Sequence, residues 1–203
     1  MKGILAAVAV VIVLVVGFIG FRIWQAQQMA AKYANAKEIA SESIEKDGSK
    51  WTLHMESVLA QPIDKVWKAL RQPERSHEFI ESFKKSELKK EEGNTKTVEF
   101  KVQVLTLPLQ TFVAQLTYND AGHSVGLKTL SGPQDQTATY QLTMLDPNKT
   151  LLVLDGTAVD KVSVPLPLSV QKGAMRELFV NQVRAIQKGI EIDEAKAKAK
   201  PAA

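Results

Sequence analysis

The sequence contains no cysteine and three histidines among its 203 residues. Without a thiol, the chain cannot form disulfides, thiolate metal sites or cysteine nucleophiles. His54, His77 and His123 are spread along the chain, without the spacing typical of metal ligands or of a base beside its nucleophile. We therefore interpret each as a surface histidine and predict no metal site, no cofactor and no catalytic residue.

Short catalytic and nucleic-acid-binding signals are also missing. No glycine-rich phosphate loop, GxSxG elbow, HExxH or CxxC pattern occurs. The formal net charge is +4 and the isoelectric point is near 9.2, but the basic residues are scattered, and three of them fall in the last eight positions. We therefore predict no nucleic-acid partner.

One long apolar run is present near the start. Residues 4–21 carry no charged or strongly polar side chain, and a helix rising about 1.5 Å per residue would nearly cross a hydrocarbon core of ~30 Å. Phe18, Phe21 and Trp24 gather at one end, as in an aromatic belt at the headgroups. A cleaved signal peptide is the alternative, but its apolar region is usually about 7 to 15 residues long. We predict a transmembrane anchor over residues 1–24 and a single-pass protein of the cytoplasmic or inner membrane, in contact with the lipid bilayer.

The charges around this run leave its orientation open. Lys2 and the terminal amine on one side face Arg22, Lys32 and Lys37 on the other, which by the positive-inside rule leans toward a cytoplasmic domain. A short N-terminal tail directly before an apolar run more often acts as a retained export signal. On that ground we favour an extracytoplasmic domain.

Two polar segments flank the central part of the chain. Residues 25–48 are rich in alanine, glutamine, glutamate and lysine at roughly helical spacing, which predicts a helical stalk or linker. A short dimerising coiled coil is the alternative, although the apolar stripe is mostly alanine. Residues 194–203 are rich in lysine and alanine and too polar to fold alone, which predicts a disordered tail. One domain of ordinary size remains, over residues 49–193.

The beginning of this domain predicts one strand and two short helices. Residues 51–55 alternate between apolar and polar side chains, which is typical of a strand. Pro62 then opens a helix in which Trp67 and its apolar neighbours recur at the i, i+3, i+4 and i+7 positions. A second short helix is predicted over residues 73–83.

In the rest of the domain, apolar and polar residues alternate with a period of two. Alternation over residues 98–104, 112–118, 125–127, 138–144 and 151–159 predicts antiparallel strands separated by turns. A long final helix follows, with one apolar stripe made of Met175, Leu178, Phe179, Val183, Ile186 and Ile190. The predicted order is one strand, two short helices, about six strands and one long helix, which is an α+β fold.

This order resembles the START and birch-pollen-allergen superfamily, also called SRPBCC, of polyketide cyclase/dehydrase type. The resemblance covers roughly residues 51–190 and includes a packing signature in AQPIDKVWKALRQPER, residues 60–75, although Gln72 stands where an aspartate is common. The matching residues are Ala60, Pro62, Val66, Trp67 and Pro73. The resemblance implies a helix-grip fold, a curved antiparallel sheet wrapped around a long C-terminal helix, here preceded by the transmembrane helix of a membrane-anchored, bacterial-type member.

Members of this superfamily bind lipids, sterols, quinones and polyketides between sheet and helix. The resemblance therefore implies a hydrophobic small molecule or lipid as the partner. The predicted cavity lining consists of the inward-directed residues Phe100, Val102, Phe112, Ala114, Leu116, Leu127, Tyr140, Leu142, Met144, Met175, Phe179 and Val183. The alternative is that these side chains fill one another's space as an ordinary core.

Three classes of function remain open. We predict non-catalytic binding of a hydrophobic small molecule or lipid by a membrane-tethered domain. A cyclase or hydrolase of the same superfamily would need an inward acid or base, and Asp155 is the one carboxylate in a strongly apolar strand, although alternation directs it outward. An assembly protein without a ligand would bind an unidentified protein, for example through the mixed charges of residues 84–92.

Overall fold

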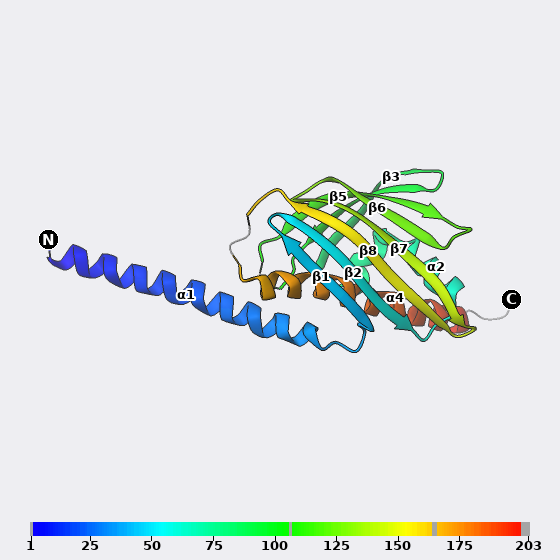
Figure 1. The fold of residues 1–203 in the computed structure, drawn as a ribbon, viewed down its shortest axis with the longest axis horizontal. Helices are drawn as coiled ribbons and strands as arrows, with labels where there is room; N and C mark the ends of the chain where they lie inside the picture. Colours follow the sequence, from blue (N-terminus) through cyan, green and yellow to red (C-terminus); the bar gives the residue numbers. More distant parts are fainter. Residues whose placement is uncertain (1, 106, 164–165, 200–203) are drawn as a thin grey trace.

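The computed structural model describes residues 2–105, 107–163 and 166–199, and the side chains of residues 2–16 and 29 lie outside that description. Figure 1 shows the chain as a long N-terminal helix followed by a curved sheet that covers a second long helix. In chain order the elements are α1 (Lys2–Ala34), β1 (Ser41–Asp47), β2 (Lys50–Leu59), α2 (Ile63–Leu70), the 3₁₀ helix η1 (Pro73–Arg75), α3 (Ser76–Phe79), β3 (Phe83–Glu92), β4 (Thr95–Val102), β5 (Gln110–Asn119), β6 (Ser124–Ser131), β7 (Gln134–Asp146), β8 (Lys149–Asp160) and α4 (Leu168–Ala199).

The eight strands of the described residues form one antiparallel sheet. Their order across it is β1-β2-β8-β7-β6-β5-β4-β3, so strands adjacent in the chain pair with each other except where β2 pairs with β8. In Figure 1 the sheet curves over α4, which runs along one of its faces. This arrangement confirms the predicted α+β, helix-grip fold.

The sheet face that looks toward α4 carries the core. Strand residues alternate between the two faces of a sheet. On β2, Trp51, Leu53 and Met55 are each at most 3% exposed, while His54 lies on the other face. The predicted alternation of this strand is therefore confirmed.

Helix α2 covers one end of this core. Val66, Trp67 and Leu70 are its buried residues, as their spacing predicts. The Trp67 ring meets the ring of Tyr118 on β5 edge to face, with 6.0 Å between the centroids. The helix thus packs on the strands through the residues that carried the family resemblance.

Helix α1 continues beyond the apolar run. Its last turns pack against α4, where Ala26, Ala30 and Tyr33 are buried. The two backbones approach closely because α4 has a glycine at the contact: a Cβ added to Gly173 would lie 2.3 Å from the Cβ of Ala30. Small residues on both helices therefore set this packing.

The prediction of a single-pass membrane protein, anchored by residues 1–24, is contradicted. Most of the predicted anchor, residues 4–16, lies outside the described side chains. Over the part of the chain that the structure describes, no helix combines the length and the apolar composition needed to cross a bilayer. The described part of α1 continues past the predicted anchor, where it includes polar residues such as Gln25, Gln28 and Lys32 and buries small residues against α4.

Residues 25–48 do not form one helical stalk. Beyond the end of α1, strand β1 pairs with β2 along its whole length. Lys46 of β1 donates a hydrogen bond to Oδ2 of Asp160 on β8 at 2.7 Å, which makes the strand an integral part of the sheet. At the other end of the chain, α4 extends through residues 194–199 of the predicted disordered tail, and residues 200–203 lie outside the description.

Candidate ligand-binding cavity

A cavity of about 370 Å³ lies between the sheet, α4 and the short helices. Small-molecule sites usually have volumes of about 300–1,000 Å³, so this one suits a small ligand. Most of the side chains that line it are apolar. The sheet contributes Leu53, Met55, Phe83, Phe100, Phe112, Leu116, Val125, Leu127, Gln136, Tyr140 and Leu154.

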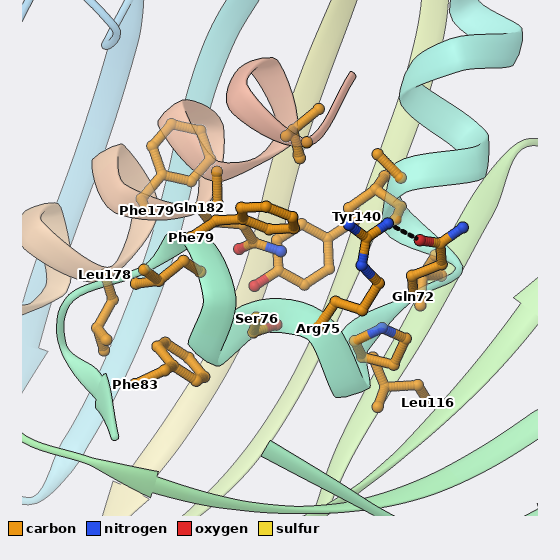
Figure 2. A pocket seen from close by; sticks show the side chains of 18 of the residues that line it. Gln72, Arg75, Ser76, Phe79, Phe83, Leu116, Tyr140, Leu178, Phe179 and Gln182 are labelled. Atoms are coloured by element: carbon orange, nitrogen blue, oxygen red, sulfur yellow. Dashed lines mark hydrogen bonds between the residues drawn. The ribbon is translucent and has the colours of Figure 1, made fainter. Parts of the chain in front are cut away.

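Aromatic side chains from both the sheet and the helices lie around the cavity. Phe83, Phe100 and Phe112 follow one another with centroid separations of 5.4 and 5.1 Å. Phe79 of α3 and Phe179 of α4 also line the cavity, and Figure 2 labels both. The helices therefore complete an apolar enclosure that the strands begin.

Some of the residues predicted to line the cavity do line it. The predicted residues that line it are Phe100, Phe112, Leu116, Leu127, Tyr140, Met175 and Phe179. Val102, Ala114, Leu142 and Val183 are instead buried in the packed core, each no more than 3% exposed. Met144 is 60% exposed because it lies near the end of β7, next to a register shift in the pairing with β8.

Several lining residues escaped the sequence analysis. Gln182 follows Phe179 by three residues and precedes Ile186 by four, so a polar residue inside the apolar stripe of the last helix was the available signal. Gln136 similarly shares one strand face with Tyr140. The basic residues of α2 gave no such signal, since charges on a short surface helix usually point to solvent.

The cavity opens between α2 and the last turns of α4. Among the described lining residues, the exposed ones belong to these two helices and include Lys65 and Lys68. Two ion pairs cross the opening: Lys65 pairs with Glu194, and Nη1 of Arg75 lies 3.3 Å from Oδ1 of Asp193. We refer to these two pairs as the mouth ion pairs. They connect α2 and η1 to α4.

Arg75 is held in place by its neighbours. Its Nη1 donates a hydrogen bond to Oε1 of Gln72 at 2.7 Å, drawn in Figure 2, and its guanidinium carbon lies 4.9 Å from the centroid of the Phe79 ring. Nε also donates to the Glu78 carboxylate at 3.2 Å. The cation is therefore a fixed part of the cavity mouth.

One polar pair lies inside, among the apolar side chains. The side chains of Tyr140 on β7 and Gln182 on α4 both line the cavity. Figure 2 shows both side chains directed into the same space as Phe79. Burial raises the pKa of Tyr140 to about 12, and the nearby Gln182 side chain opposes this effect. The hydroxyl therefore keeps its proton over the physiological pH range.

The other candidate acids and bases lie outside the cavity. Asp155 has a 63% exposed side chain and, as alternation predicted, lies on the outer face, where its Oδ1 is 2.7 Å from Nδ1 of His54. His77 lies on α3, and His123 lies in the turn between β5 and β6, with 5.6 Å between its ring centroid and that of Trp67. None of these four titratable groups is among the cavity-lining residues that the structure describes.

Known structures share this fold at low sequence identity. ZhuI aromatase/cyclase from a Streptomyces species is similar with a TM-score of 0.63 at 17% identity, over 70% of this chain and 94% of that chain. A START superfamily protein from Mycobacterium smegmatis is similar with a TM-score of 0.57 at 14% identity, over 69% and 97%. A major latex-like protein from Panax ginseng is similar with a TM-score of 0.52 at 11% identity, over 66% and 97%.

The sequence itself matches a known family. A comparison with curated protein sequences finds no match. A family model described as polyketide cyclase / dehydrase and lipid transport, however, matches residues 50–191, which is more than half of the chain and includes the whole sheet from β2 to β8. The protein therefore belongs to the polyketide cyclase / dehydrase and lipid transport family.

Proposed function

We propose that the protein binds a hydrophobic small molecule or lipid in this cavity and does not transform it. The composition of the cavity carries this proposal: most of its walls are apolar or aromatic. Among the described lining residues, the neutral polar side chains are those of Gln72, Ser76, Gln136, Tyr140 and Gln182, and the charged ones stand at the mouth. Burying apolar surface there stabilises a ligand by about 0.8 kcal/mol per methylene. The driving force is therefore the removal of an apolar molecule from water.

An enzyme is the main alternative, because one protein of similar structure is named an aromatase/cyclase. General acid–base catalysis needs a group within reach of the substrate whose pKa lies near the working pH. Inside the cavity, the titratable group of the described lining is Tyr140, and its pKa of about 12 keeps it neutral. The ionic lining groups stand at the mouth, in ion pairs or in water. Binding without catalysis accounts for this placement of the titratable groups.

A cavity-filling variant tests the proposal. The apolar dye diphenylhexatriene fluoresces only when it is shielded from water, so full-length protein should produce a saturable signal. Leu127→Trp places a large ring in the cavity from β6 and should abolish most of that signal while the protein keeps its circular dichroism spectrum. Leu130→Trp is the matched control, because this residue lies on the same strand but is 50% exposed and outside the lining.

Equal dye binding by both variants would show that the dye sits elsewhere, and the proposal would be lost. Solvent extraction of the purified protein followed by mass spectrometry should also recover an apolar compound, at lower yield from Leu127→Trp than from Leu130→Trp. Conversion of that compound into a product, when it is returned to the protein, would contradict the non-catalytic part.

A further inference from the structure

The mouth of the cavity carries more positive than negative side chains. Among the described lining residues, the cations are Lys65, Lys68 and Arg75, and the acids are Asp193 and Glu194. Both acids are already engaged in the mouth ion pairs, with Arg75 and Lys65. Lys68 is exposed and has no ion-pair or hydrogen-bond partner within the part of the chain that the structure describes. The positive charge of Lys68 is therefore not neutralised by the protein.

Gln72 adds hydrogen-bond donors to the same mouth. It follows Lys68 by four residues, and both side chains line the cavity. Oε1 of Gln72 accepts the hydrogen bond from Nη1 of Arg75, which fixes the orientation of the amide. In Figure 2 the amide nitrogen of Gln72 is directed away from Arg75. Its N–H groups have no acceptor among the described residues, so they are available to a ligand.

These available groups favour a negatively charged acceptor. The ammonium of Lys68 and the amide nitrogen of Gln72 only donate hydrogen bonds, and an oxygen anion accepts from both. Hydrogen bonds between ionised partners are roughly twice as strong as those between neutral ones. Because the mouth is open to water, an anion there keeps part of its hydration and avoids the large cost of burial in an apolar interior.

The neighbouring acids limit how much charge the mouth accepts. Asp193 and Glu194 place two carboxylates at the mouth, and the cations that face them are already paired. A second negative charge on a ligand would meet these carboxylates without a further cation, and like charges repel. The charge left by Lys68 therefore matches a head group with a single negative charge.

We propose that Lys68 and Gln72 form a subsite at the cavity mouth for the singly charged oxygen head group, such as a carboxylate, of an amphiphile. The proposal rests on the function proposed above and adds the charge and the orientation of the ligand. The tail enters between the apolar walls, where its burial drives binding, while the head group stays at the mouth in contact with water. Lys68 and Gln72 thus determine specificity, and the walls determine affinity for the tail.

A competition series with ten-carbon chains tests the subsite. Full-length protein loaded with diphenylhexatriene is titrated at pH 8 with decanoate, decanol and decyltrimethylammonium. The ratio of the decanol midpoint to the decanoate midpoint defines the anion preference, in which the contribution of the tail cancels. We expect Lys68→Met to lower the anion preference about two- to fivefold, the range for a partly exposed ion pair. Lys68→Arg should keep it, because the charge and the donors remain.

A second variant changes the donors of Gln72. Gln72→Glu keeps an acceptor oxygen for Arg75 but replaces the N–H groups by a second acceptor with a negative charge. It should also lower the anion preference, and it should strengthen competition by decyltrimethylammonium. Sodium chloride provides an independent readout, because salt screens exposed charges. Added salt should lower the anion preference of wild type and leave that of Lys68→Met unchanged.

Lys188→Met is the matched control. It removes the same charge from an exposed position on α4 that does not line the cavity, so its anion preference should equal that of wild type. If Lys68→Met behaves like Lys188→Met, or if decyltrimethylammonium displaces the dye from wild type as well as decanoate does, the subsite is wrong while apolar binding stands. If wild-type protein does not bind the dye, both proposals are overturned.

Discussion

Trp67 and Asp120 are joined by a hydrogen bond from the indole Nε1 to Oδ1 at 3.0 Å, although one belongs to α2 and the other to the turn between β5 and β6. Arg71 donates to the same oxygen, and its guanidinium carbon lies 5.3 Å from the centroid of the Tyr118 ring. The hydrogen bond from Arg71 is the main cause that holds the pKa of Asp120 below its usual range. One carboxylate therefore fixes α2, and with it one side of the cavity mouth, to the sheet.

Removing the Trp67 side chain should destabilise the whole domain. We expect Trp67→Ala to lower the free energy of unfolding by about 3 to 5 kcal/mol, as is usual for a buried tryptophan, and Trp67→Phe to lower it by less because most of the ring contact remains. Urea unfolding followed by circular dichroism measures both. Trp24→Ala is the control, since Trp24 is 55% exposed on α1. A Trp67→Ala protein as stable as the control would show that α2 does not pack as described.

Breaking a mouth ion pair should speed ligand exchange. Arg75→Met keeps an apolar stem against Phe79 but removes the bond to Asp193, and partly exposed pairs of this kind contribute modestly. We expect diphenylhexatriene to leave the variant roughly two- to fivefold faster, with unfolding little changed. Stopped-flow dilution measures the rate. An unchanged rate in both Arg75→Met and Lys65→Met would indicate that ligands leave by another route.

The outer face of the sheet should contribute a pH-dependent effect through His54. The hydrogen bond with Asp155 is the main cause that raises the pKa of His54, and Glu56 adds to it. A raised pKa stabilises the folded protein fully below the ordinary value of about 6.5, and this contribution is lost as the pH rises through the folded pKa. His54→Gln should therefore lower the melting temperature at pH 5.5 but not at pH 9.

An NMR titration gives the direct measurement, and Asp155→Asn should move the His54 pKa downward. A His54 pKa that stays unchanged in Asp155→Asn would contradict the contact on the outer face. The melting temperatures of wild type and His54→Gln are compared at the same two pH values. The contributions of other titrating groups therefore cancel in the difference.

At Glu177 on α4, in contrast, we expect a substitution that stabilises the folded protein. Its buried Oε2 accepts a hydrogen bond from the backbone N–H of Leu105 at 2.8 Å, and Leu105 has a φ of 51°. Burial raises the pKa of Glu177 and the hydrogen bond opposes this effect. Because the folded pKa lies above the ordinary value of about 4.3, stability declines as the pH rises through the folded pKa.

Glu177→Gln keeps an acceptor oxygen for Leu105 without the charge. We expect the variant to gain stability relative to wild type between pH 4.5 and pH 8, measured as the shift of the urea midpoint. Glu191→Gln, an exposed position on the same helix, is the control. A loss of stability at pH 8 would mean that the charged hydrogen bond outweighs the cost of burial.

Most of the fold could be predicted because, in a strand with one buried face, apolar and polar side chains alternate with a period of two residues. Strand β1 was missed since Ile44 is its one buried residue, so no alternation could be seen, and the helical composition before it extended the predicted helix too far. Tyr33 and Ile44 both fall in the segment predicted as one helical stalk, but they are buried in different elements, α1 and β1. A short strand with a single apolar anchor has too little pattern to be recognised.

The cavity was harder to predict than the core. Alternation says which face a residue points to, so it placed Tyr140 correctly, but Ala114 on an equally inward face is fully packed. Whether an inward residue meets a neighbour or open space depends on the curvature of the sheet and on how far α3 lies from it. Gln182 was missed because only apolar residues were counted in the helical stripe.

The cavity also gives the protein a mechanical property. Unfolding under hydrostatic pressure is favoured when it eliminates internal void volume. An apolar space of about 370 Å³ therefore makes the unoccupied fold softer and more sensitive to compression than a solidly packed domain of the same size. A ligand that fills this space removes the void, so occupancy changes the volume of unfolding as well as its free energy.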